Sequence, residues 1–199
     1  MMEMFQRSRP TVREALRMLE HNGYLRAVPG GGFIVTDIDD MDMEQVMEDA
    51  IHGGCVSLLE MGEYRTICEV NIAAWAAERR TDADLKALRE HLSRMRDVIG
   101  DCRHFIRMDP DFHCLIAEAA KNQVAVMMSK TLSGLNRGFM EQKMRSMTVM
   151  ARKRMCRRVQ LQHQAVFDAI AAGDLNAAQE AMNQHMESFQ WDLQADAIF

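Results

Sequence analysis

Apolar side chains recur every three or four positions along most of the chain after residue 40. This spacing is typical of amphipathic helices that pack around a shared core, and it leaves little room for strands. Pro110 falls inside one of these segments, so we expect a kink or a new helix start there. The predicted helices cover residues 42–52, 56–80, 81–99, 101–122 and 123–143 and the runs on either side of Gly173.

The first 36 residues follow a different pattern, which predicts a small separate unit. Ser8 can cap a helix over about residues 10–22 that turns four apolar side chains to a buried side. Two short apolar runs, YLRAV and FIVTD, then enclose a glycine-rich tip and predict a β-hairpin. We therefore expect two domains, residues 1–36 and residues 37–199, the second with one sizeable core. The apolar positions of the first helix are Val12, Ala15, Leu16 and Leu19.

Charge is distributed unevenly between these two segments. Residues 1–36 carry five Arg and three Glu, whereas residues 37–199 carry 19 basic and 26 acidic side chains. The first segment is therefore the candidate partner of a polyanion. Arg9, Arg13 and Arg17 come early on its helix and away from the apolar side, with Thr11 among them. Side chains so placed can contact DNA in the major groove, although a solvated basic helix beside a hairpin is the alternative.

The composition is that of an ordinary globular protein, with 48% apolar and 27% charged residues and a net charge of −5. Every apolar run is shorter than the roughly 18 residues of a membrane span, and the first residues contain no signal-peptide hydrophobic region. The five cysteines are scattered without a CxxC pair, which favours reduced thiols in the core. We expect a cytoplasmic protein that does not associate with membranes.

Four polar side chains occupy positions on the predicted apolar stripes. His163 and His185 stand where a core Leu would normally lie, ten residues before and twelve after Gly173. At a rise of about 1.5 Å per residue, two helices joined at this glycine would hold both rings level to within about 3 Å. Asp109 and His113 are one helical turn apart, so both can point at one spot.

Each of these four groups needs a polar partner in the core. A separate hydrogen-bond partner for each histidine is one interpretation. One divalent cation would satisfy all four groups, and three neutral imidazoles with one carboxylate suit Zn²⁺, Ni²⁺ or Mn²⁺ better than Ca²⁺ or Mg²⁺. The other histidines lack such partners, and we interpret them as surface residues. They are His21, His52, His91 and His104.

Two further polar residues are candidate ligand contacts. Arg65 lies on the apolar stripe of residues 56–80, where an uncompensated charge costs several kcal/mol. An internal pair with Glu69, four residues later, is one explanation. The other is that the guanidinium binds a carboxylate, for which its bidentate geometry is well suited. Asn136 flanks the stripe of residues 123–143 and either hydrogen-bonds a ligand or faces solvent.

The segment SRPTVREALRMLEHNGYLRAVPGGGFIV resembles the recognition helix and wing of the GntR family of bacterial transcription regulators. The family's winged helix-turn-helix has a very similar S-R-x-x-V-R-E-A-L-x-x-L-E-x-x-G signature. Family members carry two earlier helices before this point, so we expect a truncated winged-helix fragment that lacks part of its core. The residues that the resemblance implies as contacts to operator DNA are Arg9, Thr11, Arg13, Arg17 and Gly31.

Residues 40–199 resemble the FCD ligand-binding domain of FadR-type GntR regulators. This resemblance implies an all-α fold, an antiparallel bundle of about seven helices. Many such domains bind a metal through a D-x-x-x-H, H, H pattern, and they commonly receive a small carboxylate that touches the metal and an arginine of the first long helix. Arg65 matches that arginine. The residues that match the metal-binding pattern are Asp109, His113, His163 and His185.

The pattern and the resemblance together favour a DNA-binding transcription regulator, not an enzyme, that senses a small organic acid through a divalent transition metal. A homodimer is the expected state, because two-fold dimers fit two-fold operators. A metal-dependent enzyme that uses the three-His, one-Asp site is the leading alternative. A dimeric ligand-binding remnant that does not touch DNA is another.

Overall fold

The computed structural model describes residues 8–21, 24–35, 47 and 50–194, and the side chains of these residues except 133, 135–136 and 190–194. The chain divides into two compact units, residues 1–45 and residues 46–199. The predicted domain boundary after residue 36 falls in a stretch outside the described residues. Each unit is described by itself.

The first unit consists of one helix and a two-stranded hairpin. Helix α2 (Arg9–His21) begins after Ser8, whose hydroxyl accepts a hydrogen bond from the Thr11 amide at 3.4 Å. Strands β1 (Leu25–Ala27) and β2 (Phe33–Val35) pair antiparallel, with Leu25 opposite Val35. Glycines 30–32 form the tip with φ angles of +94°, +97° and +106°, which other residues rarely adopt. The predicted helix and hairpin are therefore present.

The apolar side of α2 is not buried, contrary to our expectation. Val12 and Leu16 are half-buried, whereas Ala15 and Leu19 are exposed. One helix and one hairpin cannot enclose a core, because each element shields only one side of the other. This segment thus has the elements of a winged helix without a buried interior in the described residues.

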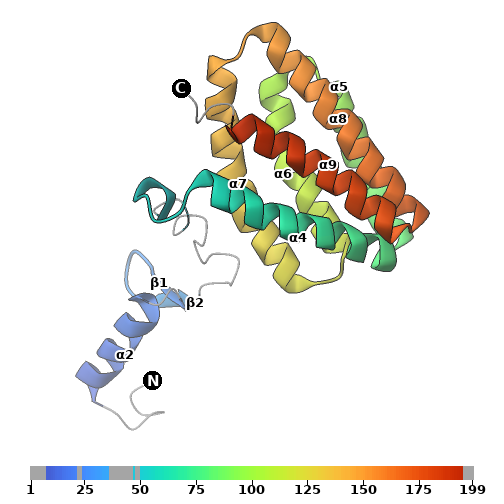
Figure 1. The fold of residues 1–199 in the computed structure, drawn as a ribbon. Coiled ribbons are helices and arrows are strands. Elements are labelled where there is room, and N and C mark those ends of the chain that lie inside the picture. The colour runs from blue at the N-terminus through green and yellow to red at the C-terminus, as the bar shows by residue number, and fades with distance from the viewer. Residues whose placement is uncertain (1–7, 22–23, 36–46, 48–49, 195–199) are drawn as a thin grey trace. The chain divides into compact units, whose positions relative to one another are not determined.

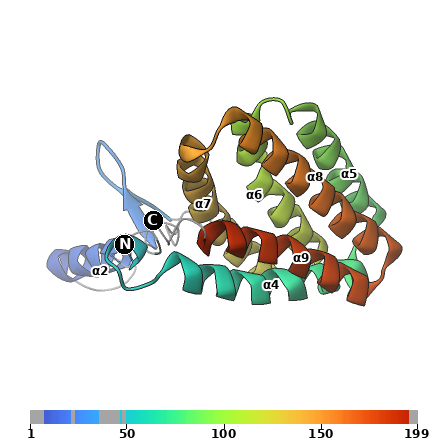
Figure 2. The same cartoon turned by 45° about the horizontal axis from the view of Figure 1, so that its top comes forward.

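The second unit is an antiparallel bundle of long helices joined by short turns, as predicted (Figure 1). Helix α4 lies beside α9, α5 packs on α6 and α8, and α6 also packs on α7 (Figure 2). A short helical stretch at residues 47 and 50–52 precedes them, so the described part of this unit has the seven helical segments expected. The long helices are α4 (Leu58–Arg79), α5 (Asp82–Asp97), α6 (Cys102–Ala119), α7 (Gln123–Ser146), α8 (Val149–Ala172) and α9 (Leu175–Gln194).

Local sequence signals set the ends of these helices. Ser57 and Thr81 each form a capping box with the acidic residue three positions later, which satisfies two amides at the start of α4 and α5. Gly173 ends α8 with φ at +74°, and the Asp174 carboxylate then accepts a hydrogen bond from the Ala177 amide at 2.9 Å. The predicted turn between the last two helices is confirmed.

One continuous hydrophobic core fills the bundle. Most of the apolar stripe positions are buried in it; Val124, which we expected in the core of the helix over residues 123–143, is instead 66% exposed. Helix α6 runs without a break through Pro110, so no new helix starts there; the ring costs one backbone hydrogen bond. All five cysteines are free, but only Cys156 is a core thiol. Buried stripe residues include Leu88, Leu92, Met95, Ile116, Val166, Ile170 and Met182.

Within the described residues, no helix is both long enough and apolar enough to cross a bilayer.

Candidate metal centre

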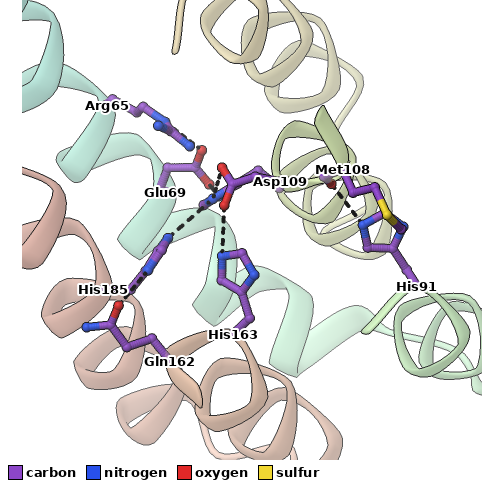
Figure 3. Close-up of polar contacts among 9 residues, drawn as sticks. Arg65, Glu69, His91, Met108, Asp109, Gln162, His163 and His185 are labelled. Carbon is purple, nitrogen blue, oxygen red and sulfur yellow. Dashed lines mark hydrogen bonds and ion pairs between the residues drawn. The ribbon is translucent and has the colours of Figure 1, made fainter. Parts of the chain in front are cut away.

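Three histidines from three different helices meet inside the bundle. His113 on α6, His163 on α8 and His185 on α9 are all buried, and each offers a ring nitrogen within 4.8 Å of the other two. The Nε2 atoms of His113 and His185 lie 3.4 Å apart. Figure 3 shows His163 directed toward Asp109 of α6. The structure thus brings the three predicted histidines together, with Asp109 beside His113 and His163.

The Asp109 carboxylate completes this cluster. Its Oδ1 lies 3.5 Å from His163 Nε2, and its Oδ2 lies 4.0 Å from His113 Nε2. Four ligand atoms placed tetrahedrally around an ion at about 2.1 Å would be about 3.4 Å from one another. The His113–His185 and His163–Asp109 spacings of 3.4 and 3.5 Å are therefore close to those that a transition metal requires, whereas the 4.0 Å between Asp109 and His113 is longer.

The alternative, a separate hydrogen-bond partner for each histidine, fails at His163. Both nitrogens of this ring are buried without a hydrogen-bond partner in the described part of the chain. A buried polar group without a partner costs about 1–3 kcal/mol, so such groups are rare in folded proteins. The donor set therefore fits a cation better than it fits a protein-only network.

Electrostatics keeps the imidazoles in the form that binds metals. Burial, followed by the charges of the neighbouring histidines, holds the pKa of both His163 and His185 well below the ordinary value of 6.5. Both rings are consequently neutral near pH 7, with a lone pair available. Burial raises the pKa of Asp109, against the opposing influence of His113 and Arg65. A bound cation would favour the charged carboxylate and reverse that shift.

A second layer of polar residues orients two of the rings. His113 Nδ1 lies 3.1 Å from Glu69 Oε2, and His185 Nδ1 lies 3.3 Å from Gln162 Oε1. The side-chain amide of Gln162 in turn donates a hydrogen bond to Ser188 Oγ at 2.8 Å. The hydrogen bond at His185 Nδ1 favours a proton there and leaves Nε2 to face the centre, whereas the Glu69 contact with His113 is close without forming a hydrogen bond. Neither pairing could be predicted from the sequence, because each joins two different helices.

Arg65 is buried beside the cluster and is only partly neutralised. Its Nε donates to Glu69 Oε1 at 3.3 Å, which confirms the predicted internal pair, and its guanidinium lies 5.3 Å from the centre of the Phe189 ring. Its Nη2, however, is buried without a hydrogen-bond partner in the described residues. Arg65, Asp109 and His185 line a cavity of about 30 Å³ next to the cluster. The arginine therefore has donor capacity left on the side of the candidate centre.

The other singled-out residues have simpler surroundings. His91 is buried, not at the surface as we predicted, because its Nε2 reaches the Met108 carbonyl at 2.9 Å (Figure 3). His21, His52 and His104 are exposed as predicted. The side chain of Asn136 lies outside the described residues. The candidate DNA contacts on α2 and at the hairpin tip are all exposed; they are Arg9, Thr11, Arg13, Arg17 and Gly31.

Comparison with known proteins identifies the family. Residues 1–35 match the model of the bacterial regulatory proteins of the gntR family, and residues 60–188 match the FCD domain. The chain belongs to the GntR family of bacterial transcription regulators and carries an FCD domain. Regulators of this family bind operator DNA, and this GntR-family chain is a transcription regulator, not an enzyme.

Individual relatives support this assignment along nearly the whole chain. The HTH-type transcriptional regulator LutR of Bacillus subtilis is 28% identical over 94% of this chain and 85% of its own length. The galactonate operon transcriptional repressor of Escherichia coli is 29% identical over 90% of this chain and 78% of its own. A GntR protein of Streptococcus agalactiae has a similar fold, with a TM-score of 0.64 at 21% identity over 95% of this chain and 84% of that one.

Glu69 links Arg65 to His113, so its removal tests how the cluster is held. We expect Glu69→Gln to lower the free energy of unfolding by about 3 kcal/mol, because it leaves the buried Arg65 charge uncompensated. Burial raises the pKa of Glu69, but His113 and Arg65 together outweigh burial and lower this pKa from 4.5 to about 2. The stabilisation is therefore present above about pH 4.5 and is lost as the pH falls toward 2.

Urea unfolding of the chelator-treated protein at several pH values measures this effect. The difference between wild type and Glu69→Gln should be largest near pH 6 and should shrink toward pH 3. Glu63→Gln, at an exposed position of the same helix, is the control and should change stability by less than about 0.5 kcal/mol. A difference that does not change with pH would contradict this role of Glu69.

Proposed function

We propose that this regulator senses a small carboxylate through a divalent transition metal held by Asp109, His113, His163 and His185. The observation that carries the proposal is the convergence of three buried imidazoles, two of them beside the Asp109 carboxylate, with no hydrogen bond to His163 among the described residues. Neutral imidazoles with one carboxylate suit Zn²⁺, Ni²⁺ or Mn²⁺. When bound, the metal would supply a positive centre with a coordination position for a carboxylate oxygen.

Arg65 is the proposed second contact for the acid. Its buried Nη2 has no hydrogen-bond partner among the described residues, and its guanidinium shares the lining of the 30 Å³ cavity with Asp109 and His185. A guanidinium that gives only its Nε to Glu69 still has donors for a second carboxylate. Recognition would therefore combine a hydrogen bond from Arg65 with the charge at the histidine cluster.

The size of the cavity suggests how binding is transmitted. A volume of 30 Å³ holds about one water, so any organic acid must displace side chains on α4, α8 or α9 to enter. Binding then favours a bundle arrangement in which those side chains have moved. This preference is what a sensor requires, because a ligand shifts an equilibrium only by its difference in affinity for the two states.

The metal content of the purified protein tests the site directly. We expect about one equivalent of transition metal per chain, and we expect His163→Ala combined with His185→Ala to reduce it to the background of a buffer blank. His104→Ala, at an exposed position on α6, should retain the metal. Circular dichroism shows whether each variant is folded. A folded double variant with unchanged metal content would refute the proposed site.

Arg65→Lys tests the carboxylate contact separately from the metal. Lysine keeps the positive charge beside Glu69 but loses the planar fork, so the affinity for the acid should fall by about tenfold or more while the metal content stays unchanged. A thermal-shift panel of small hydroxy acids, including galactonate, on metal-loaded protein measures the effect. Lys86→Ala, at an exposed position, should respond as the wild type does. Equal affinities for Arg65→Lys and wild type would exclude this role.

We further propose that α2 and the hairpin contact operator DNA and that the chain is a homodimer. The arginines of α2 are exposed and available for bases or phosphates. On the bundle, an apolar cavity of about 290 Å³ between α4 and α7 is lined in part by Tyr64, Ile67 and Val124, all more than half exposed. Its lining contains no charged side chain, so two copies of this surface could meet across a two-fold axis without repulsion.

Two variants separate DNA contact from dimerisation. Arg13→Ala should weaken binding to the operator by roughly tenfold in gel shifts without changing the mass in sedimentation. Ile67→Glu should dissociate the dimer and thereby weaken operator binding as well. Leu161→Glu, at a position of α8 that is 72% exposed outside this surface, is the control. A dimer that does not bind any operator would instead favour a ligand-binding remnant.

A further inference from the structure

A second cavity, separate from the histidine cluster, is lined by four arginines, one glutamate and one methionine. It has a volume of about 300 Å³ and lies among the first turns of α6 and α8 and the last part of α7. Such a volume is within the range of small-molecule sites. Its lining residues are Arg103, Arg107, Glu141, Met144, Arg145 and Arg152.

The charge of this cavity is not balanced by the protein. Glu141 is its single carboxylate and pairs with Arg107 at 3.4 Å. Within the described part of the chain, Arg103 and Arg145 have no ion pair, and the buried Nε of Arg152 has no hydrogen-bond partner. Four guanidinium groups thus face one acid, in a protein whose net charge is −5.

The position of Arg152 makes the excess of positive charge larger. Arg152 lies in the first turn of α8, which contains no acidic residue, whereas Arg103 lies in the first turn of α6 next to the N-cap carboxylate of Asp101. The amino-terminal end of a helix carries a partial positive charge, so cations are unfavourable there and anions are favourable. Arg103, Arg107 and Arg145 are exposed to solvent, and a concave site lined by charge of one sign concentrates ions of the opposite sign.

We propose that this cavity binds a small polyanion with at least two anionic groups, such as an organic phosphate or a polycarboxylate. Arginines from three helices can each donate paired hydrogen bonds to an oxyanion, and a single carboxylate has too few oxygens to accept all of them. The site contains none of the residues of the proposed metal centre. Its ligand is therefore a second ligand of the regulator, distinct from the acid proposed for the histidine cluster.

Pyrophosphate is a suitable probe, measured by calorimetry and thermal shift on the chelator-treated full chain so that no metal mediates binding. We expect binding that raises the melting temperature and weakens with salt. Arg145→Gln combined with Arg152→Gln should reduce the affinity by about tenfold or more. Arg137→Gln combined with Arg154→Gln removes two exposed arginines of the same helices outside the cavity and should leave the affinity unchanged.

Glu141→Gln provides a test in the opposite direction. Because it removes the only carboxylate of the lining and frees Arg107, it should tighten pyrophosphate binding by about threefold. The proposal is overturned if pyrophosphate does not bind the wild type, if the two pairs of substitutions have equal effects, or if Glu141→Gln weakens binding. It is also overturned if only a DNA duplex, and not pyrophosphate, depends on Arg145 and Arg152. Loss of the proposed metal site would alter none of these results.

Discussion

The bundle is built around buried polar groups that its described side chains satisfy only in part. Three imidazoles and the Asp109 carboxylate occupy positions where apolar residues would pack well, and among the described residues His163 has no hydrogen-bond partner at either nitrogen. An all-protein core would gain stability by replacing such groups with leucine, since burying an unpartnered polar group costs about 1–3 kcal/mol. A cation bound where α6, α8 and α9 meet would give these polar groups a partner and explain why they occupy core positions.

The geometry of this point depends on a turn about ten residues away. Gly173 joins α8 to α9 and thereby fixes which residues of the two helices face each other. A Cβ at Gly173 would lie 2.8 Å from Arg80 Nη2, which donates to the Ala171 carbonyl at 3.0 Å. The positive φ favours glycine, whereas the close contact involves only the far end of the flexible Arg80 side chain, which can move aside. The level of His163 relative to His185 is thus set by backbone conformation and not by contacts within the cluster.

Local signals predicted the fold well because helices depend on residues three or four positions apart. The glycine turn and the stripe positions of the histidines were evident from spacing alone. Pairings between helices were not, because no short-range pattern encodes them: His91 meets the Met108 carbonyl, and Glu69 meets His113. The exposed stripe of α2 shows the same limit, since an apolar pattern indicates what a helix can bury and not whether a neighbour covers it.

Glu69 has a special position in the proposed sensor because it contacts both sides of the site. One of its oxygens accepts from Arg65 Nε and the other lies 3.1 Å from His113 Nδ1. A carboxylate that binds Arg65 would compete with Glu69 for the guanidinium, and any movement of Glu69 would change the orientation of His113. The binding of the acid and the binding of the metal would then be coupled through Glu69, which contacts neither ligand. Such coupling is reciprocal: the acid increases the affinity for the metal by the same factor as the metal increases the affinity for the acid. Helix α4 carries both Arg65 and Glu69, and it is the long helix nearest in sequence to the DNA-binding unit. A displacement of these two side chains would therefore act on the helix best placed to transmit the change to that unit.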